Sequence, residues 1–193
     1  MSKRRAKQYI SLATVAIVLL FAACQHFGWF QAATQPVAQN NPGLYAIDHY
    51  VDGDTITVTM SGKAETVRFI GVDTPETHRP NTPVQCYGPA AAAYTKSQIA
   101  QAGGKVRLEA DPESDNRDKY GRLVRYVYLP DGRLLDKLLI QNGYGFAYTY
   151  YPFTKSADFA AAQENAQVAH KGLWGNCHPY QESNGRWQTE AAS

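Results

Sequence analysis

The stretch YAIDHYVDGDTITVTMSGKAETVRFIGV (residues 45–72) decides the fold of this chain. Residues 45–60 predict two strands that flank Asp52-Gly53, because Asp-Gly is a favoured tight-turn pair between strands. Residues 65–72 predict a third strand. The first half of the chain is therefore strand-rich.

A polar loop and a helix follow these strands. The loop, residues 74–83, holds three prolines and shows no periodicity. Pro89 suits the first turn of a helix, which continues through residues 90–102 and ends at Gly103-Gly104. We therefore expect a helix directly after the third strand.

The second half of the chain adds two strands and two helices. The leucines between residues 134 and 139 recur at helical spacing, and we expect Ser156 to cap the last helix. The predicted segments are strands at 105–110 and 123–128, an acidic loop at 111–119 between them, and helices at 134–142 and 156–171. This order predicts an α+β fold, a five-stranded OB-fold β-barrel with three α-helices.

The N-terminus has the pattern of an export signal. Residues 2–7 carry four basic side chains and no acidic one, and residues 9–23 form a mostly apolar run. Three outcomes stay open: acylation of Cys24 in the lipoprotein-like LFAAC, an uncleaved signal anchor over residues 9–30, or cleavage and secretion. We expect the domain on the outer side of the cytoplasmic membrane, membrane-anchored or secreted.

Composition and charge divide the chain further. We expect a signal peptide or signal anchor at residues 1–30, a flexible linker at 31–43, the barrel domain at 44–178, and a polar, frayed tail at 179–193. The 193 residues, 44% of them hydrophobic, suit one such domain with appendages. The formal net charge is only +2, so overall basicity does not predict a nucleic-acid partner.

The cysteines fit an exported domain. With Cys24 assigned to the N-terminal segment, Cys86 and Cys177 remain as a pair. An exported domain permits a disulfide between them, and two free thiols are the alternative. Zinc is disfavoured, because the chain has no CxxC motif and its histidines do not cluster.

Two carboxylates are candidate metal ligands. Asp54 lies in VDGDT, at the start of a predicted strand, and Asp73 lies in VDTPET, where the third strand ends. Ca²⁺ takes oxygen ligands from carboxylates, carbonyls and water. The residue before a proline is biased to an extended conformation, so the carbonyl of Thr74 is a reasonable third ligand. Each Asp alone is more simply a turn or cap residue.

Three charged residues near these carboxylates suit phosphodiester chemistry. Arg68 and Arg122 carry planar guanidinium groups that match phosphate oxygens in a way that lysine cannot. Glu76, three residues after Asp73, can hold a water beside a metal as a general base or as an orienting group. A surface ion pair is the alternative reading for either arginine taken alone.

A basic and aromatic set completes the candidates. Tyr148 and Tyr150 lie in AYTYYP, and aromatic rings stack on bases without sequence preference. Lys119 and Tyr120 of DKYGR are placed to contact a neighbouring phosphate. Packing tyrosines and a solvated loop are the simpler readings of these residues.

These motifs together resemble the staphylococcal nuclease (thermonuclease) family. The motifs VDGDT, VRFIGVDTPET, YGPAA, DKYGR and GLW occur in the family's order over about two thirds of the chain, residues 45–174. The resemblance implies an OB-fold nuclease that uses Ca²⁺. It assigns the calcium ligands to Asp54, Asp73 and the Thr74 carbonyl, the catalytic roles to Arg68, Glu76 and Arg122, and the nucleotide contacts to Lys119, Tyr120, Tyr148 and Tyr150.

The resemblance also implies the activity. We expect an exported, monomeric, calcium-dependent endonuclease that hydrolyses DNA and RNA with little sequence specificity and leaves 3′-phosphate ends. Cys86, Cys177 and the acidic loop depart from the family pattern. The rival hypothesis is a non-catalytic OB-fold module that binds nucleic acid, but such modules generally lose the carboxylates or the arginines that this chain retains.

Overall fold

The computed structural model describes residues 43–78 and 82–192. The predicted N-terminal signal, Cys24 and all but the last residue of the linker lie outside these described residues. Among the helices that are described, none combines the length and the apolar character that a membrane span requires.

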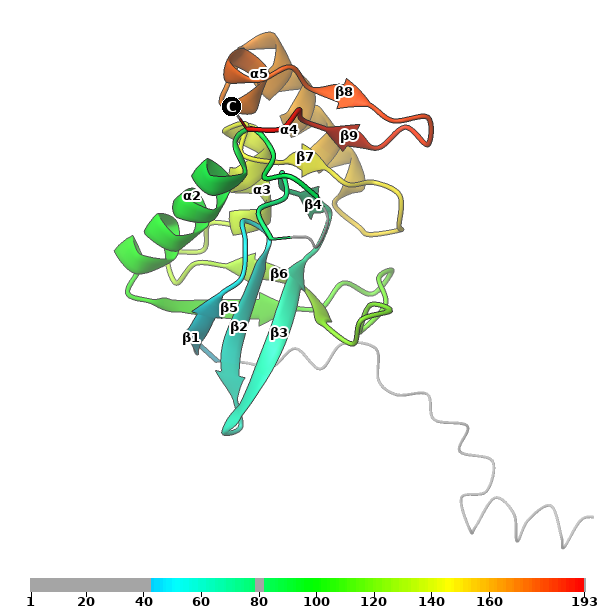
Figure 1. The fold of residues 1–193 in the computed structure, drawn as a ribbon. Coiled ribbons are helices and arrows are strands. Elements are labelled where there is room, and N and C mark those ends of the chain that lie inside the picture. Colours follow the sequence, from blue (N-terminus) through cyan, green and yellow to red (C-terminus); the bar gives the residue numbers. More distant parts are fainter. Residues whose placement is uncertain (1–42, 79–81, 193) are drawn as a thin grey trace, which may run out of the picture. The chain divides into compact units, whose positions relative to one another are not determined.

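Five strands close into a barrel in the order β1-β2-β3-β6-β5 (Figure 1). Neighbouring strands pair antiparallel, except β3 and β6, which run parallel. The barrel strands are β1 (Tyr45–Tyr50), β2 (Thr55–Met60), β3 (Lys63–Phe69), β5 (Lys105–Glu109) and β6 (Leu123–Tyr128). The predicted five-stranded barrel is thus confirmed.

The β2–β3 hairpin shows how local sequence builds this barrel. Ile56 and Val58 alternate with more exposed residues along β2, and both are fully buried. The connecting Ser61 and Gly62 have φ angles of 50° and 75°. Positive φ at both central residues is the turn geometry that matches the twist of paired strands. The hairpin therefore forms with the side chains on one face, including Ile56 and Val58, buried in the core.

The helices lie above the barrel strands in Figure 1 and close that end of the core. Leu135, Leu139 and Phe159 are fully buried helix residues that join the barrel side chains in one hydrophobic cluster. The helices are α2 (Gly88–Gln101), α3 (Leu135–Gln141), α4 (Ser156–Val168) and α5 (Leu173–Asn176), and a small sheet pairs β4 (Val72–Asp73) with β7 (Phe146–Ala147).

The predicted cap of the last long helix is wrong. Ser156 is the first residue of α4, the N-cap is Lys155, and no side chain makes a capping hydrogen bond there. Instead, Phe159 anchors this turn through its fully buried ring. Tertiary packing therefore replaces the local cap that the sequence pattern favoured.

The prediction of a frayed C-terminal tail is also wrong. Residues 180–188 form a hairpin of β8 (Tyr180–Gln181) and β9 (Trp187–Gln188). The Trp187 ring stacks on Phe146, with centroids 6.0 Å apart, and meets Trp174 edge-on at 5.0 Å. One large aromatic residue anchors an otherwise polar segment, because burying its ring offsets the cost of ordering the chain.

A disulfide joins two distant parts of the domain. The sulfur atoms of Cys86 and Cys177 are 2.00 Å apart, and the two residues are separated by 91 positions in the chain. Cys86 lies just before α2, and Cys177 follows α5. The bond therefore ties the segment that precedes the first helix to the C-terminal end of the domain.

A buried carboxylate in α3 gives a testable pH dependence. Asp136 is fully buried, and its Oδ2 accepts a hydrogen bond from the Val127 amide at 2.9 Å. Burial raises the pKa of this carboxyl well above its usual value. Because the folded-state pKa exceeds the unfolded one, the ionised group lowers stability increasingly as pH rises above the unfolded pKa of about 3.9.

Replacing Asp136 with Asn is therefore expected to stabilise the protein at pH 7. The amide oxygen still accepts from Val127, and no charge is buried. The free energy of unfolding in urea should rise, by about 1.4 kcal/mol for each pKa unit by which burial raises the pKa of this carboxyl. The gain should shrink as pH falls toward 4, where the wild-type carboxyl is protonated. Asp131→Asn, at an exposed turn, is the control. A loss of stability at pH 7 would contradict this account.

Candidate active site

Strand register brings three of the predicted residues to one rim of the barrel. Thr55 of β2 pairs with Arg68 of β3. Leu123, the first residue of β6, pairs with Val67, which directly precedes Arg68. Asp54 directly precedes β2 and Arg122 directly precedes β6. Residues from three separate segments thus meet at the ends of adjacent strands.

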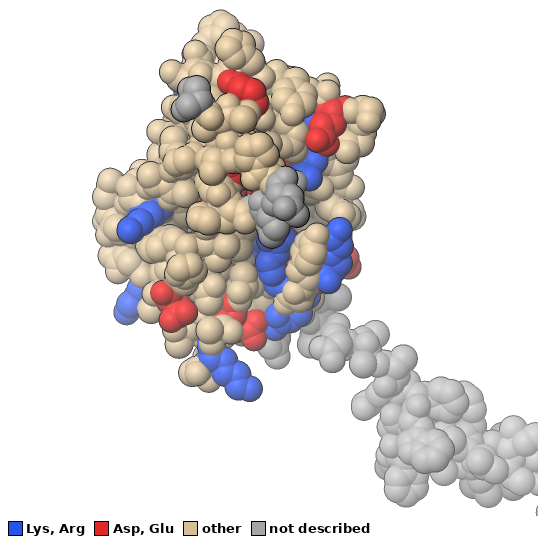
Figure 2. Space-filling view, in the orientation of Figure 1, with Lys and Arg blue, Asp and Glu red and all other residues tan. Residues whose placement is uncertain are grey.

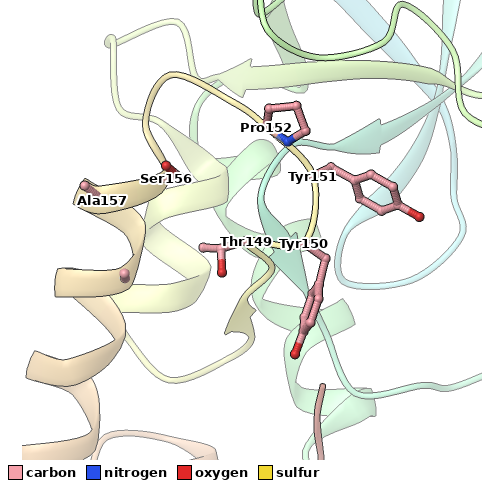
Figure 3. A pocket seen from close by; sticks show the side chains of 7 residues that line it. Thr149, Tyr150, Tyr151, Pro152, Ser156 and Ala157 are labelled. Carbon is pink, nitrogen blue, oxygen red and sulfur yellow. The ribbon is translucent and has the colours of Figure 1, made fainter. Parts of the chain in front are cut away.

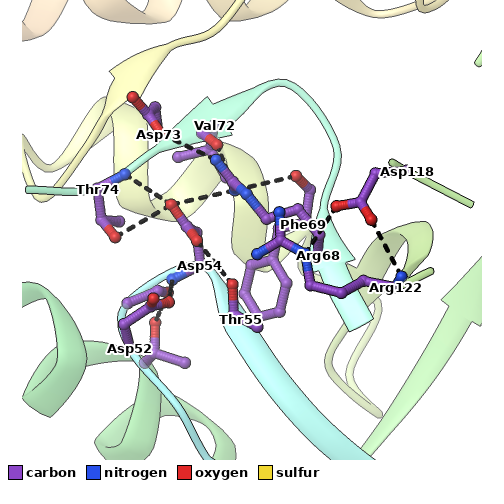
Figure 4. Close-up of polar contacts among 12 residues, drawn as sticks. Asp52, Asp54, Thr55, Arg68, Phe69, Val72, Asp73, Thr74, Asp118 and Arg122 are labelled. Carbon is purple, nitrogen blue, oxygen red and sulfur yellow. Dashed lines mark hydrogen bonds and ion pairs between the residues drawn. The ribbon is translucent and has the colours of Figure 1, made fainter. Parts of the chain in front are cut away.

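The second carboxylate reaches the same rim from β4. Asp54, Asp73 and Thr74 are all buried, at 5%, 7% and 6% exposure. The backbone amide and the hydroxyl of Thr74 donate to Asp54 Oδ2 at 2.7 and 3.1 Å (Figure 4). These bonds hold Thr74, the residue after Asp73, against Asp54, so the two aspartates belong to one cluster.

Arg68 bridges the two aspartates. Its Nη1 lies 3.0 Å from Asp54 Oδ2, and its Nη2 lies 2.9 Å from Asp73 Oδ1 (Figure 4). Nη1 also donates to the carbonyl of Val72 at 2.7 Å and to that of Phe69 at 3.3 Å. Burial alone would lower the pKa of this guanidinium, but the carboxylates raise it above its usual value. Arg68 is therefore a rigidly held cation.

The donor set fits a hard divalent cation. Both carboxylates face the same point, since one guanidinium contacts both of them. Asp54, Asp73 and the Thr74 carbonyl would hold a calcium ion through oxygen atoms alone, and its remaining ligands would be water and substrate. Within the described residues, three or more His, Cys, Asp or Glu ligands converge only at Cys86, Cys177 and Glu190, where both sulfurs are consumed by the disulfide.

Asp52 belongs to the cluster, although the sequence reading treated it only as a turn residue. Its Oδ1 accepts a hydrogen bond from the Asp54 amide at 3.1 Å. Burial, reinforced by the neighbouring charge of Asp54, raises the pKa of Asp52 to about 7. The one feature of the sequence that could have placed Asp52 in the site is its position two residues before Asp54. Asp52 therefore adds a third carboxyl group beside Asp54.

Arg122 lies in the same cleft but pairs within its own loop. Its Nε donates to Asp118 Oδ2 at 2.7 Å, and its guanidinium lies 5.4 Å from the centre of the Tyr120 ring. Burial alone would raise the pKa of Asp118, but the hydrogen bonds from Arg122 lower it below its usual value. The loop thus presents Arg122 in a defined position beside the two aspartates and Arg68.

The loop that carries Glu76 is fixed by backbone contacts. The Glu76 amide donates to Gln85 Oε1 at 2.7 Å, and the Gln85 amide donates to the Glu76 carbonyl at 2.9 Å. Gly88 at the start of α2 is required here, since a Cβ on it would lie 2.9 Å from that carbonyl. The main chain of Glu76 is therefore held in place on the loop that precedes α2.

One cleft of about 510 Å³ collects nearly all the predicted site residues. Lys119 and Tyr120 line it from the loop before β6, where the Tyr120 side chain is 72% exposed. The predicted residues that line the cleft are Asp54, Arg68, Asp73, Thr74, Glu76, Lys119, Tyr120, Arg122 and Tyr148. Basic, acidic and aromatic groups thus share one surface.

Tyr150 is the exception. It packs on Tyr148 with ring centroids 5.0 Å apart, but it lines a separate shallow pocket of about 380 Å³ together with Thr149 and Ser156 (Figure 3). Its side chain is 48% exposed. Tyr150 therefore extends the aromatic surface away from the aspartates and does not line the central cleft.

Arg186 of the C-terminal hairpin is the second residue that sequence reasoning missed. Its Nε and Nη2 donate to Asp73 Oδ2 at 3.0 and 2.8 Å, and it lines the cleft. Burial alone would lower the pKa of Arg186, but Asp73 raises it. No sequence signal could connect Arg186 with Asp73, because the two residues are 113 positions apart and Arg186 lies in a segment that was expected to be frayed.

Several basic side chains gather in one region of the face shown in Figure 2. Figure 2 shows Lys and Arg side chains close together over the region where β3, β6 and the loop before β6 lie in Figure 1. The remainder of that face is mostly uncharged. A nearly neutral chain therefore still offers a basic surface where a polyanion would approach the cleft.

Comparison with known proteins agrees with this geometry. The family model described as staphylococcal nuclease homologue matches residues 66–176. Endonuclease YncB of Bacillus subtilis (strain 168) is 41% identical over 148 residues, which cover 75% of this chain and 68% of that protein. Thermonucleases of Staphylococcus intermedius and Staphylococcus hyicus are 39% and 38% identical, over 84% and 86% of this chain and 93% and 95% of their own.

Proposed function

The chain belongs to the staphylococcal nuclease family and is a nuclease, and we propose that it is exported and cleaves DNA and RNA with calcium. The observation that carries this proposal is the Arg68 bridge between Asp54 and Asp73. It gathers two oxygen ligands and one phosphate-binding group at the floor of a cleft that Glu76 and Arg122 also line.

Each residue of the cleft has a chemical role in this proposal. Asp54, Asp73 and the Thr74 carbonyl would hold the calcium ion, which would supply positive charge to the scissile phosphate. Arg68 and Arg122 would bind the non-bridging oxygens through planar forks, and their grip would tighten as charge builds in the transition state. Glu76 would orient the attacking water or remove its proton.

In this proposal the direction of cleavage is the one that the family resemblance implies, and the residues of the cleft support a broad range of substrates. Water attacks phosphorus in line with the 5′-oxygen, which leaves, so the products carry 3′-phosphates. Lys119 and Tyr120 would contact a neighbouring phosphate, while Tyr148, with Tyr150 beside it, would stack on bases. Stacking and phosphate contacts read no base edges, so the proposed nuclease discriminates little among sequences.

Export suits this chemistry. The basic start of the chain and the apolar run of residues 9–23 are the basis for placing the nuclease outside the cytoplasmic membrane, anchored through an uncleaved helix or an acylated Cys24. Fractionation with an antibody to the domain tests the placement. Activity confined to the cytosol would overturn export, and a soluble extracellular form that begins near residues 32–39 would overturn the anchor.

Calcium dependence is the decisive test of the proposed activity. Plasmid DNA and RNA should both be cleaved in Ca²⁺, and excess chelator should abolish cleavage. Mg²⁺ should support little turnover, because it demands near-octahedral geometry and holds its waters tightly. Asp54→Asn should weaken calcium binding measured by calorimetry, and the exposed Asp131→Asn should not.

Two outcomes would contradict the proposal. Full activity in excess chelator would indicate a phosphodiesterase that needs no metal. Tight binding of nucleic acid without any cleavage would favour a non-catalytic OB-fold module, the rival from another functional class. End-labelling of the products separately checks that the phosphate remains on the 3′ side.

A further inference from the structure

The C-terminal hairpin places a third guanidinium in the cleft. Arg186 directs both Nε and Nη2 to Asp73 Oδ2, at 3.0 and 2.8 Å. Its guanidinium also lies 5.6 Å from the centre of the Tyr148 ring. Arg186 therefore stands between a proposed calcium ligand and a proposed base-stacking residue, although it comes from outside the barrel.

The residues that follow Arg186 fix its position. Trp187 packs against both Phe146 and Trp174, which also contact each other. The side chain of Gln188 accepts a hydrogen bond from Gln85, whose own oxygen accepts from the Glu76 amide. The hairpin is thus built into the domain, and it supports the loop that carries the proposed water-binding Glu76.

Each carboxylate oxygen of the two aspartates already accepts at least one hydrogen bond. Asp73 Oδ1 accepts from Arg68 and Asp73 Oδ2 from Arg186. Asp54 Oδ2 accepts from Thr74 and Asp54 Oδ1 from the Thr55 hydroxyl. A divalent cation bound between these carboxylates would lie close to the two guanidiniums that contact Asp73, so charge repulsion favours the departure of one of them.

Arg186 is the donor that can leave at the lowest cost. Arg68 is held by four acceptors on three sides, including the carbonyls of Phe69 and Val72. The Thr74 amide is part of the buried main chain. For the Arg186 side chain, Asp73 is the hydrogen-bonding partner that the described residues provide, and the long side chain can swing without moving the hairpin backbone.

We propose that Arg186 is an exchangeable counter-ion: it neutralises Asp73 while the site lacks metal, and it passes to a substrate phosphate when calcium binds. This inference rests on the proposed calcium-dependent nuclease function and deepens it. Once released, Arg186 remains beside Tyr148, where it adds a third guanidinium for the nucleic-acid backbone. The hairpin thereby raises the calcium concentration that the enzyme needs and strengthens substrate binding.

Arg186→Gln separates these two effects because they have opposite signs. In the full-length chain, purified in mild detergent, calorimetry with Ca²⁺ alone should show about tenfold tighter binding than in the wild type, within the usual range of coupling between ligands. With saturating calcium, KM for single-stranded DNA should rise while kcat changes little. The slope of log KM against log salt should fall by about 0.7, the loss of one phosphate contact.

Two variants serve as controls. Arg133→Gln removes a guanidinium from a remote surface pair with Asp131, so it matches the change in net charge without touching the cleft. It should leave calcium affinity and KM unchanged. Arg186→Lys keeps the positive charge but lacks the planar guanidinium fork. It should therefore restore part of the salt slope, and its calcium affinity should lie between those of the wild type and Arg186→Gln.

The outcomes distinguish this inference from the proposed function. If the wild type binds calcium and cleaves DNA, but Arg186→Gln shows unchanged or weaker calcium affinity, the exchange is wrong and the proposed function stands. Weaker binding of both calcium and DNA would identify a structural role and also refute the exchange. If neither the wild type nor any of the variants binds calcium, the proposed calcium site is wrong, and the proposed exchange of Arg186 is wrong with it.

Discussion

Replacing Glu76 with Gln is expected to lower kcat by roughly 10²–10⁴-fold, the usual contribution of a positioned acid–base group. The fold should be unchanged, because Glu76 is held by its main chain through Gln85 and glutamine has nearly the same shape. Arg122→Lys should lower kcat by a similar factor, roughly 10²–10³-fold for one lost transition-state donor. Lysine keeps the charge but cannot present two parallel donors to a phosphate.

Matched substitutions separate chemistry from structure. Arg107 and Glu109 form a surface ion pair at 2.8 Å on β5, outside the cleft. Arg107→Lys and Glu109→Gln should leave kcat near the wild-type value. The comparison requires kcat at saturating calcium and DNA, with circular dichroism to establish that each variant is folded. A near-normal rate for Glu76→Gln or Arg122→Lys would make that residue structural and refute its catalytic role.

Removing the disulfide is expected to cause the largest loss of stability. The bond joins residues 91 positions apart, and chain-entropy models assign about 4–5 kcal/mol to a loop of this length, with less often realised. In the double variant Cys86→Ser/Cys177→Ser, the urea midpoint should fall strongly. The melting temperature should drop by on the order of 10 °C, given about 2–4 °C per kcal/mol for a domain of this size.

The chemistry should survive that loss. Neither cysteine lines the cleft, so kcat measured well below the melting temperature should remain near the wild-type value. Reduction of the wild-type protein should reproduce the lower melting temperature of the double variant. Titration that finds Cys86 and Cys177 both free in the soluble, oxidised domain would contradict the bond, and equal stability of the oxidised and reduced forms would contradict the entropic account.

Local sequence was sufficient for the barrel and for the identity of most candidate residues. The Asp52-Gly53 turn and the two strands that flank it are properties of neighbouring residues, and the structure has both strands where the pattern indicated them, at Tyr45–Tyr50 and Thr55–Met60. The parallel pairing of β3 with β6 and the disulfide geometry come from distant contacts. Ser156 is the first residue of α4 and does not cap it, while Phe159 in the first turn is fully buried in the core.

By itself, the sequence determined which elements form and which side chains are available for chemistry, because hydrophobic period, turn residues and residue type are local properties. Only the tertiary structure decided how those side chains meet. Register at the barrel rim set Asp54 beside Arg68, and one partly buried tryptophan, Trp187, folded a polar tail back so that Arg186 reached Asp73. Such contacts depend on the burial of surfaces far apart in the chain, which no local pattern records.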